Sequence, residues 1–214
     1  AIGAAVRSLE NDPLKSDIGK HGENRESFPA YEKLSLDNVL LLREKTIPFS
    51  FSAPGVTLPV PAYLGVDIGS VSTNLVVTDE SGRVIKEIYT RTNARPIEVV
   101  SEGLREIQRD VGKKIHIKGV ATTGSGRELI GILIGADTIN DEITAHKTGA
   151  LHVCHAMLDR EVDTIFEIGG QDSKFISIED GIVVDFTMND ACAAGTGSFL
   201  EEQEIGRASC RESV

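Results

Sequence analysis

The segment best suited to chemistry is residues 67–74 (DIGSVSTN), which combines an acid, a glycine and several hydroxyl groups. A glycine lets the main chain approach a ligand closely, and main-chain N–H groups and hydroxyls in such a turn suit phosphate oxygens. Asp67 could hold Mg²⁺ through water, since Mg²⁺ gives up its own waters reluctantly. An ordinary hairpin turn uses the same residue types, so this segment alone leaves both interpretations open. The predicted phosphate-binding residues in it are Gly69, Ser70, Ser72 and Thr73.

A second segment repeats this order 100 residues further along, at 167–174 (EIGGQDSK). Each copy follows an apolar run and has an acid, an isoleucine, a glycine and a small residue in that order, which suggests a duplicated half. Two such loops facing each other would clamp the phosphates of a nucleoside triphosphate, and a polar side chain would orient the attacking water. The predicted catalytic residues are Asp67, Gln171 and Asp172. The residues of this second segment predicted to bind the cofactor are Gly169, Gly170 and Lys174.

A third segment, residues 189–200 (NDACAAGTGSFL), sets a lone cysteine, Cys192, among small residues before a predicted helix. Small neighbours leave room for a bulky group on the sulfur, and the start of a helix stabilises an anion. A thiolate-bound iron–sulfur cluster fits, although such a cluster takes four cysteines, so a symmetric partner would have to contribute. A buried structural cysteine is the alternative that residue chemistry alone favours. The predicted cofactor-binding residues also include Gly195, Thr196 and Gly197.

A group of histidines and a cysteine on the predicted helix 142–158 raises the question of zinc. Their spacing matches no known set of zinc ligands, so structural or surface roles are the preferred interpretation. The residues concerned are His146, His152, Cys154 and His155.

The elements that would position these segments follow from the apolar pattern. Residues 63–69 (YLGVDIG) predict a buried strand that ends in a glycine turn, and residues 73–91 predict two strands joined at 80–82. Pro96 suits the first turn of a helix, and apolar residues then recur at three- and four-residue steps up to Val111. This order of elements predicts an α/β fold with a mixed sheet. The remaining predicted elements are a strand at 116–124, helices at 127–135 and 142–158, a strand at 163–170 and a hairpin at 173–187.

Composition excludes several classes of protein. The 214 residues are 40% hydrophobic and 26% charged, which excludes a wholly disordered chain. A net charge of −11 makes the chain a poor binder of nucleic acid or of an anionic membrane. No apolar run is long enough to predict a membrane span, no signal peptide is visible, and three scattered cysteines predict a reducing, cytoplasmic setting. Because the first residue is Ala1 rather than methionine, we expect the true N-terminus to be missing.

Taken in order, the three segments resemble the BadF/BadG/BcrA/BcrD-type ATPases. The resemblance covers about residues 62–203 and includes 121–131 (ATTGSGRELIG) and 140–150 (NDEITAHKTGA). The family comprises ATP-dependent activators of 2-hydroxyacyl-CoA dehydratases and related subunits of benzoyl-CoA reductases. Its most specific motif here is 188–201 (MNDACAAGTGSFLE), because turns like that at 67–70 are shared by the actin, sugar-kinase and chaperone ATPases.

This resemblance implies an actin-like, ribonuclease H-like fold with duplicated lobes, the second of them truncated here. It also implies ATP and Mg²⁺ as ligands, and a homodimer that shares one 4Fe–4S cluster, to which each subunit gives two cysteines. Cys192 matches the first cysteine, neither Cys154 nor Cys210 matches the second, and the second would lie beyond residue 214. The implied activity is ATP hydrolysis that delivers a low-potential electron to a dehydratase or a benzoyl-CoA reductase-like partner. A sugar or small-metabolite kinase, or a non-catalytic ATP-binding module, remains an alternative.

The chain is predicted to divide into five parts. Residues 1–10 resemble the closing helix of a preceding module, and residues 11–61 form a proline-rich linker. Residues 62–160 form the first lobe, and 161–203 begin the second lobe with the cysteine motif. The tail 204–214 (EIGRASCRESV) resembles a translated sequencing adapter, so we expect it to be non-native. On this division we expect the 214-residue chain to be inactive by itself.

Overall fold

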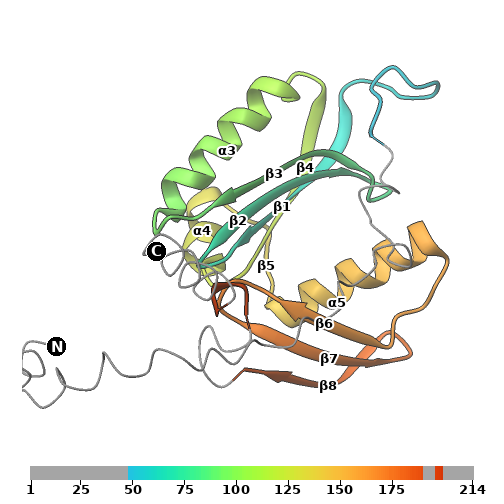
Figure 1. Cartoon of the computed structure of the whole chain (residues 1–214). Helices are drawn as coiled ribbons and strands as arrows, with labels where there is room; N and C mark the ends of the chain where they lie inside the picture. Colours follow the sequence, from blue (N-terminus) through green and yellow to red (C-terminus); the bar gives the residue numbers. More distant parts are fainter. Residues whose placement is uncertain (1–47, 190–195, 200–214) are drawn as a thin grey trace, which may run out of the picture. The chain divides into compact units, whose positions relative to one another are not determined.

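A computed structural model of the chain describes residues 48–189 and 196–199 (Figure 1). The predicted preceding module, most of the linker and the tail lie outside these ranges, as do Cys192 and Gly195. The described strands are β1 (Val60–Ile68), β2 (Ser72–Asp79), β3 (Val84–Arg91), β4 (Ile115–Thr123), β5 (Thr138–Ile139), β6 (Thr164–Ile168), β7 (Ser173–Glu179) and β8 (Ile182–Met188). The helices are α3 (Pro96–Asp110), α4 (Arg127–Ile134) and α5 (Glu142–Val153), with a π-helical turn at Cys154–Leu158.

The first sheet has five strands in the order β3-β2-β1-β4-β5. β1, β2 and β3 pair antiparallel, while β4 is parallel to β1 and β5 is parallel to β4. The predicted mixed sheet is therefore confirmed. β5 was not predicted, because its two residues are too few to leave a period in the sequence.

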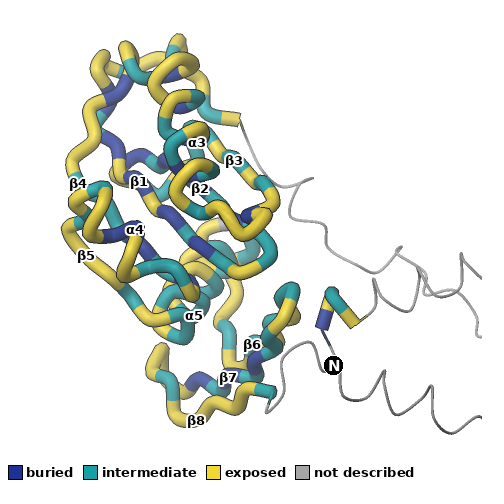
Figure 2. Tube along the Cα trace, turned by 90° about the vertical axis from the view of Figure 1, so that its left-hand side faces the viewer, coloured by how far each residue is buried: buried dark blue, intermediate teal, exposed yellow. Residues whose placement is uncertain are grey.

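One face of this sheet carries the main core (Figure 2). Residues of alternating positions in β1 and β2 are buried there against α3 and α4. The close approach of α3 depends on Gly103, where a Cβ would lie 2.9 Å from Leu75 Cδ1. The sequence predicts a buried strand at 63–69; in β1 one set of alternate residues is buried while Tyr63 and Gly65 are exposed, because alternate residues of a strand point to opposite faces.

The second sheet is antiparallel, in the order β6-β7-β8. The turn after its first strand resembles the turn after β1. In the turn after β1, Gly69 N donates to Ser72 O at 2.9 Å, and in the turn after β6, Gly169 N donates to Asp172 O at 2.9 Å. The same hydrogen bond at positions 100 residues apart supports the duplication inferred from the sequence.

Helix α5 leads from the first sheet to the second. Its N-cap is Asp141, whose side chain accepts a hydrogen bond from Thr144 N at 2.8 Å. No residue of α5 is fully buried. The predicted helix 142–158 keeps α-helical geometry to Val153 and ends in the π-helical turn.

Candidate functional site

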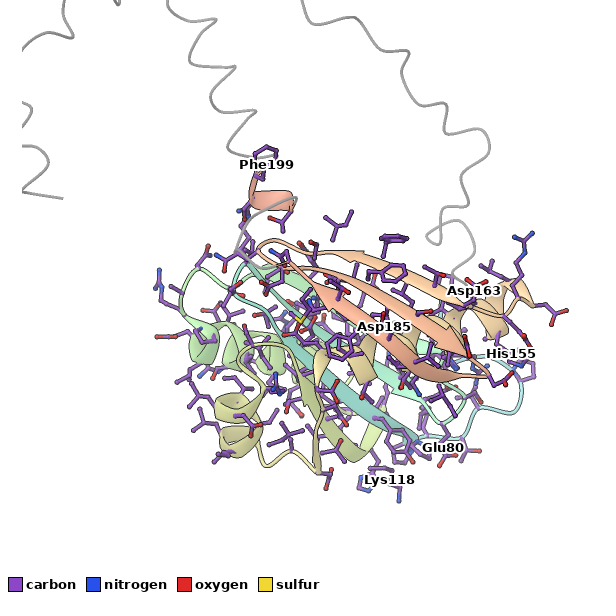
Figure 3. All side chains as sticks on the ribbon, turned by 90° about the horizontal axis from the view of Figure 1, so that it is seen from below. Glu80, Lys118, His155, Asp163, Asp185 and Phe199 are labelled. Atoms are coloured by element: carbon purple, nitrogen blue, oxygen red, sulfur yellow. The ribbon has the colours of Figure 1, made fainter. Side chains whose placement is uncertain are left out.

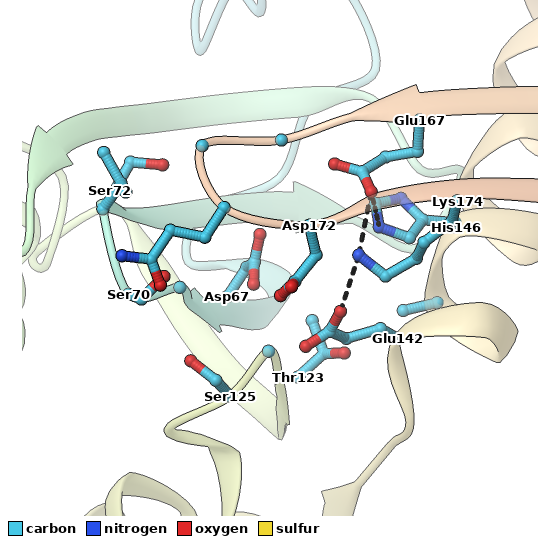
Figure 4. Close-up of a pocket in the computed structure, with 17 residues that line it drawn as sticks. Asp67, Ser70, Ser72, Thr123, Ser125, Glu142, His146, Glu167, Asp172 and Lys174 are labelled. Carbon is cyan, nitrogen blue, oxygen red and sulfur yellow. Dashed lines mark hydrogen bonds and ion pairs between the residues drawn. The ribbon is translucent and has the colours of Figure 1, made fainter. Parts of the chain in front are cut away.

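A cavity of about 290 Å³ lies where three glycine-containing loops meet (Figure 4). The first loop follows β1, the second follows β6, and the third follows β4. Both segments that the sequence analysis predicted to bind phosphate line this cavity. The lining residues are Asp67, Gly69, Ser70, Val71, Ser72, Thr123, Gly124, Ser125, Glu142, Ala145, His146, Glu167, Gly169, Gly170, Gln171, Asp172 and Lys174.

Hydroxyl groups behind the first loop fix its shape. Thr92 Oγ1 donates to Gly69 O at 2.7 Å, and Thr73 Oγ1 lies 2.9 Å from Thr92 Oγ1. Because the Thr92 hydroxyl has one hydrogen, already given to Gly69 O, Thr73 is the donor to Thr92. Thr73 is fully buried and lies behind the cavity wall, so the structure places it as a support of the loop. Its predicted role as a phosphate ligand stays a prediction.

The third loop, residues 123–125, was missed as part of the site. It is attached to the end of β1, because Gly126 N donates to Ile68 O at 2.9 Å and Ser125 Oγ donates to the same oxygen at 3.3 Å. Gly124 has a φ of +86°, and a Cβ there would lie 2.5 Å from Asp67 Oδ1. The usable signal was a glycine directly after a strand, which often marks a close approach of the main chain to another group.

The carboxyl group of Asp67 lies half-buried between the first and third loops. Burial raises the pKa of Asp67 above its ordinary value, and it outweighs the hydrogen bond that Asn74 Nδ2 donates at 3.4 Å. Glu142 and Glu167 act in the same direction as burial, while His146 acts against it. A carboxylate in such surroundings gains from a nearby cation.

The second loop touches the first through a glycine. A Cβ at Gly170 would lie 2.6 Å from Val71 Cγ2, so only a glycine fits against Val71 with the loops at this separation. Gln171 is exposed and Asp172 is half-buried, and both line the cavity as predicted. Their chemical roles stay predictions.

Asn189 and Gly197, two residues of the cysteine motif, hydrogen-bond to the second loop. Asn189 Oδ1 accepts a hydrogen bond from Ser173 N at 2.8 Å, and Asn189 Nδ2 donates to Gln171 O at 3.3 Å. Gly197 N donates to Gly169 O at 2.9 Å, so this predicted binding residue supports the loop from outside the cavity. Thr196 is fully buried, and its hydroxyl has no hydrogen-bond partner among the described residues.

An ion-pair cluster closes one end of the cavity. Lys174 Nζ lies 2.8 Å from Glu167 Oε2 and 2.9 Å from Glu142 Oε2, and its side chain is 4% exposed. Burial alone would lower the pKa of Lys174, but the hydrogen bonds to Glu167 and Glu142 outweigh burial and raise it. His146 Nε2 lies 3.9 Å from Glu167 Oε2. Glu142, Glu167 and His146 were not predicted as site residues; Glu142 and Lys174 are 32 positions apart, and Glu167 was counted only as part of the repeated turn.

The other candidates for zinc lie away from this cluster. His152 packs against the β2–β3 turn, where a Cβ at Gly82 would collide with the imidazole. His155 is exposed near the end of the helical stretch (Figure 3). Across residues 48–189 and 196–199, no group of three or more His, Cys, Asp or Glu side chains is arranged to hold a metal ion.

None of the helices in these ranges is long and apolar enough to cross a membrane.

Comparison with known proteins gives consistent matches. The profile of the BadF/BadG/BcrA/BcrD ATPase family matches residues 64–204. The (R)-2-hydroxyglutaryl-CoA dehydratase activating ATPase of Acidaminococcus fermentans is 34% identical over 143 residues, which cover 64% of this chain and 50% of that protein. The chain spans between 32% and 53% of the length of such curated relatives.

Two solved structures share the arrangement of the described elements. The crystal structure of component A of the A. fermentans (R)-2-hydroxyglutaryl-CoA dehydratase has a TM-score of 0.56 and 27% identity, covering 65% of this chain and 51% of that chain. The activator of the 2-hydroxyisocaproyl-CoA dehydratase from Clostridium difficile, with bound ADPNP, has a TM-score of 0.53 and 31% identity, covering 65% and 50%. The described elements therefore have the actin-like ATPase fold predicted from the sequence.

Proposed function

This chain belongs to the BadF/BadG/BcrA/BcrD ATPase family, and from that premise we propose that it is part of an ATP-dependent activator of a 2-hydroxyacyl-CoA dehydratase or a benzoyl-CoA reductase-like enzyme. In this proposal ATP hydrolysis drives delivery of a low-potential electron to the partner enzyme. Support comes from relatives named as dehydratase-activating proteins and from a solved relative with bound ADPNP. The proposal concerns a whole protein of the length of these relatives, about half of which this chain spans.

The observation that carries the proposal is that both phosphate loops face one cavity. The loops after β1 and β6 share one turn geometry and contact each other at Val71 and Gly170. Their main-chain N–H groups and the hydroxyls of Ser70 and Ser72 would bind phosphate oxygens. Gln171 or Asp172 would orient the attacking water, which is the contribution that positioned polar groups make in phosphoryl transfer.

The charge of the cavity favours a nucleotide bound together with a divalent cation. Four carboxyl groups line it, those of Asp67, Glu142, Glu167 and Asp172, against the ammonium of Lys174. A free triphosphate would be repelled by this excess of negative charge. Mg²⁺ would neutralise it and would reach Asp67 through water, since Mg²⁺ keeps several of its own waters.

In this proposal the cysteine motif responds to movement of the second loop. Two residues of the motif donate hydrogen bonds to that loop, Asn189 Nδ2 to Gln171 O and Gly197 N to Gly169 O. This chain offers Cys192 as one of the four thiolates that a 4Fe–4S cluster takes, so the others would come from the rest of the whole protein and from a second copy. Such a cluster supplies one-electron chemistry when bound. Movement of the second loop on hydrolysis would be passed to the motif through these hydrogen bonds.

The division of the chain belongs to the same proposal. Residues 62–160 would form the first lobe and 161–203 the start of the second, with 1–10 from a preceding module, 11–61 as a linker and 204–214 as non-native sequence. The chain alone would then be inactive, because it spans about half the length of its relatives.

The test is to express the whole protein without oxygen and to compare Cys192→Ser with Cys154→Ser. We expect Cys192→Ser to lose bound iron and electron transfer to the partner while keeping ATP hydrolysis. Cys154 is a partly buried free thiol outside the site, so Cys154→Ser should change neither property. Full iron content and electron transfer in Cys192→Ser would contradict the proposal. Phosphate transfer to a sugar, unaffected by Cys192→Ser, would indicate the kinase alternative instead.

A further inference from the structure

Lys174 has surroundings that differ from those of a phosphate-binding lysine. It lies beside the second loop and lines the cavity, but its ammonium is already held by two carboxylates at 2.8 and 2.9 Å. Its side chain is 4% exposed, and turning it toward the cavity would leave two partly buried carboxylates without their cation. Separating a buried ammonium from its carboxylate partners in this way is unfavourable.

The three charged groups come from three different elements. Glu142 is the first residue of α5, Glu167 is near the end of β6, and Lys174 is the second residue of β7. Glu167 and Lys174 are directly opposite each other in the β6–β7 ladder. The second loop connects the two strands just beyond this pair. Glu142 joins this pair to α5, and Figure 4 shows the two dashed contacts that converge on the lysine.

The carboxylate of Glu167 also lies close to the second loop. Its Oε2 faces Lys174, while its Oε1 lies where a Cβ at Gly169 would be only 2.8 Å away. A shift of α5 would pull on Lys174 through Glu142, and a shift of Lys174 would move the carboxylate that packs on Gly169. The cluster therefore connects the start of α5 to the main chain that faces the phosphates.

We propose that Glu142, Glu167 and Lys174 form an ionic latch that fixes the start of α5 to the second phosphate loop, with Lys174 as a positioning residue whose ammonium stays off the phosphates. The latch keeps the loop in place for hydrolysis and couples it to α5, which leads from one lobe to the other. This role in hydrolysis rests on the proposed function. The geometry of the latch itself does not.

The test compares Glu142→Gln with wild type in the whole protein, measuring kcat for ATP hydrolysis and the Kd for Mg²⁺-ADPNP. A latch predicts that kcat falls by about tenfold or more, while the Kd changes by less than about threefold, because the variant loses positioning and keeps the binding groups. A phosphate-binding Lys174 predicts the opposite: releasing it from Glu142 leaves kcat unchanged and leaves the Kd equal or lower. That second result would overturn the proposal.

The lysine provides the second half of the test. Lys174→Met should lower kcat as Glu142→Gln does. The double variant should have a kcat no lower than that of the less active single variant, since the effects of residues that act as a unit are not additive. If Lys174→Met instead raises the Kd for ADPNP by about tenfold or more while Glu142→Gln does not, Lys174 is a phosphate ligand and the latch is wrong. Lys174→Met can fail to fold, because it leaves two carboxylates facing each other, and Glu142→Gln then decides alone.

The matched control is Glu98→Gln. Glu98 is the acidic residue in the first turn of α3, as Glu142 is in the first turn of α5, so both substitutions remove the same favourable charge from a helix start. Glu98→Gln should leave kcat and Kd unchanged, which separates loss of the latch from loss of a helix-terminal charge.

Failure of the proposed function can be recognised separately. If the wild-type whole protein neither binds nor hydrolyses ATP, the proposed function fails, and the latch is then tested by urea unfolding of the 214-residue chain. Coupling between Glu142→Gln and Lys174→Met in the free energy of unfolding supports the latch, and additive effects overturn it.

Discussion

Gly124 in the third loop provides the sharpest test of the site geometry. Its φ is +86°, a left-handed conformation that residues with a side chain rarely adopt. A Cβ there would lie 2.5 Å from Asp67 Oδ1 and 2.6 Å from Ile68 O. Gly124→Ala therefore strains the main chain and also pushes on the carboxylate that we assign to the Mg²⁺ side of the nucleotide.

The expected cost can be separated into two parts by a control. Gly135 is also left-handed, with a φ of +67°, but nothing lies within 4 Å of a Cβ built there. Gly135→Ala should cost only the backbone term, about 1–2 kcal/mol of unfolding free energy. Gly124→Ala should cost about 1–3 kcal/mol more, the usual range for forcing extra atoms into a packed site.

The assay is urea unfolding of the 214-residue chain for stability and ATP hydrolysis by the whole protein for activity. Gly124→Ala should unfold at a lower urea concentration than Gly135→Ala and should lose most of its hydrolysis, because Asp67 is displaced. Gly135→Ala should keep its activity. Equal destabilisation by the two substitutions, or full hydrolysis in Gly124→Ala, would refute the assigned contact between the third loop and Asp67.

Three further predictions concern single contacts, each read out by urea unfolding of the chain. Gly170→Ala should be destabilising, and less so when combined with Val71→Gly, which removes the Val71 Cγ2, Cβ and Cγ1 atoms that lie 2.6, 2.7 and 3.2 Å from the new Cβ; the same cost in both backgrounds would show that the loops do not touch. Burial raises the pKa of Asp79, but hydrogen bonds from Arg83 and from main-chain N–H groups outweigh it and hold that pKa below its ordinary value. The stability from this group should be present above about pH 3.9 and be lost as the pH falls through the lowered pKa, so parallel pH curves for wild type and Asp79→Asn would contradict the assignment. Gly149→Ala in α5 should raise the free energy of unfolding by about 0.5–1 kcal/mol, because a Cβ there meets nothing within 4 Å and alanine is the better helix former. A lower free energy of unfolding would contradict the open space beside Gly149.

Much of the fold could be predicted because its signals are local. The strands ending at Ile68 and Ile168 are apolar runs closed by glycine, and the helix at Pro96 begins with a residue suited to its first turn. The repeat of 100 residues predicted that the two turns would be alike, and each carries the same hydrogen bond. β5 and the π-helical end of the α5 stretch could not be predicted, because two residues or one wide turn leave no periodic signal.

The site was less predictable, because its key contacts join residues distant in sequence. The sequence marks Lys174 as a cation near a glycine loop, but not its pairing with Glu142, 32 positions earlier in the chain. Likewise, the sequence marks Thr73 as a phosphate ligand but does not show the hydrogen bond between its hydroxyl and that of Thr92 behind the loop. Such pairings depend on how the two sheets and α5 pack, which no local pattern contains.

The most direct test of the central claim is equilibrium binding of ADPNP to the whole protein with and without Mg²⁺, compared between wild type and Asp67→Asn. The acidic cavity predicts one nucleotide per chain, bound by wild type only when Mg²⁺ is present. It also predicts that Asp67→Asn loses most of the gain in affinity that Mg²⁺ provides. Absence of binding in the presence of Mg²⁺, or equal affinity with and without the cation, would contradict a Mg²⁺-nucleotide site between the two phosphate loops.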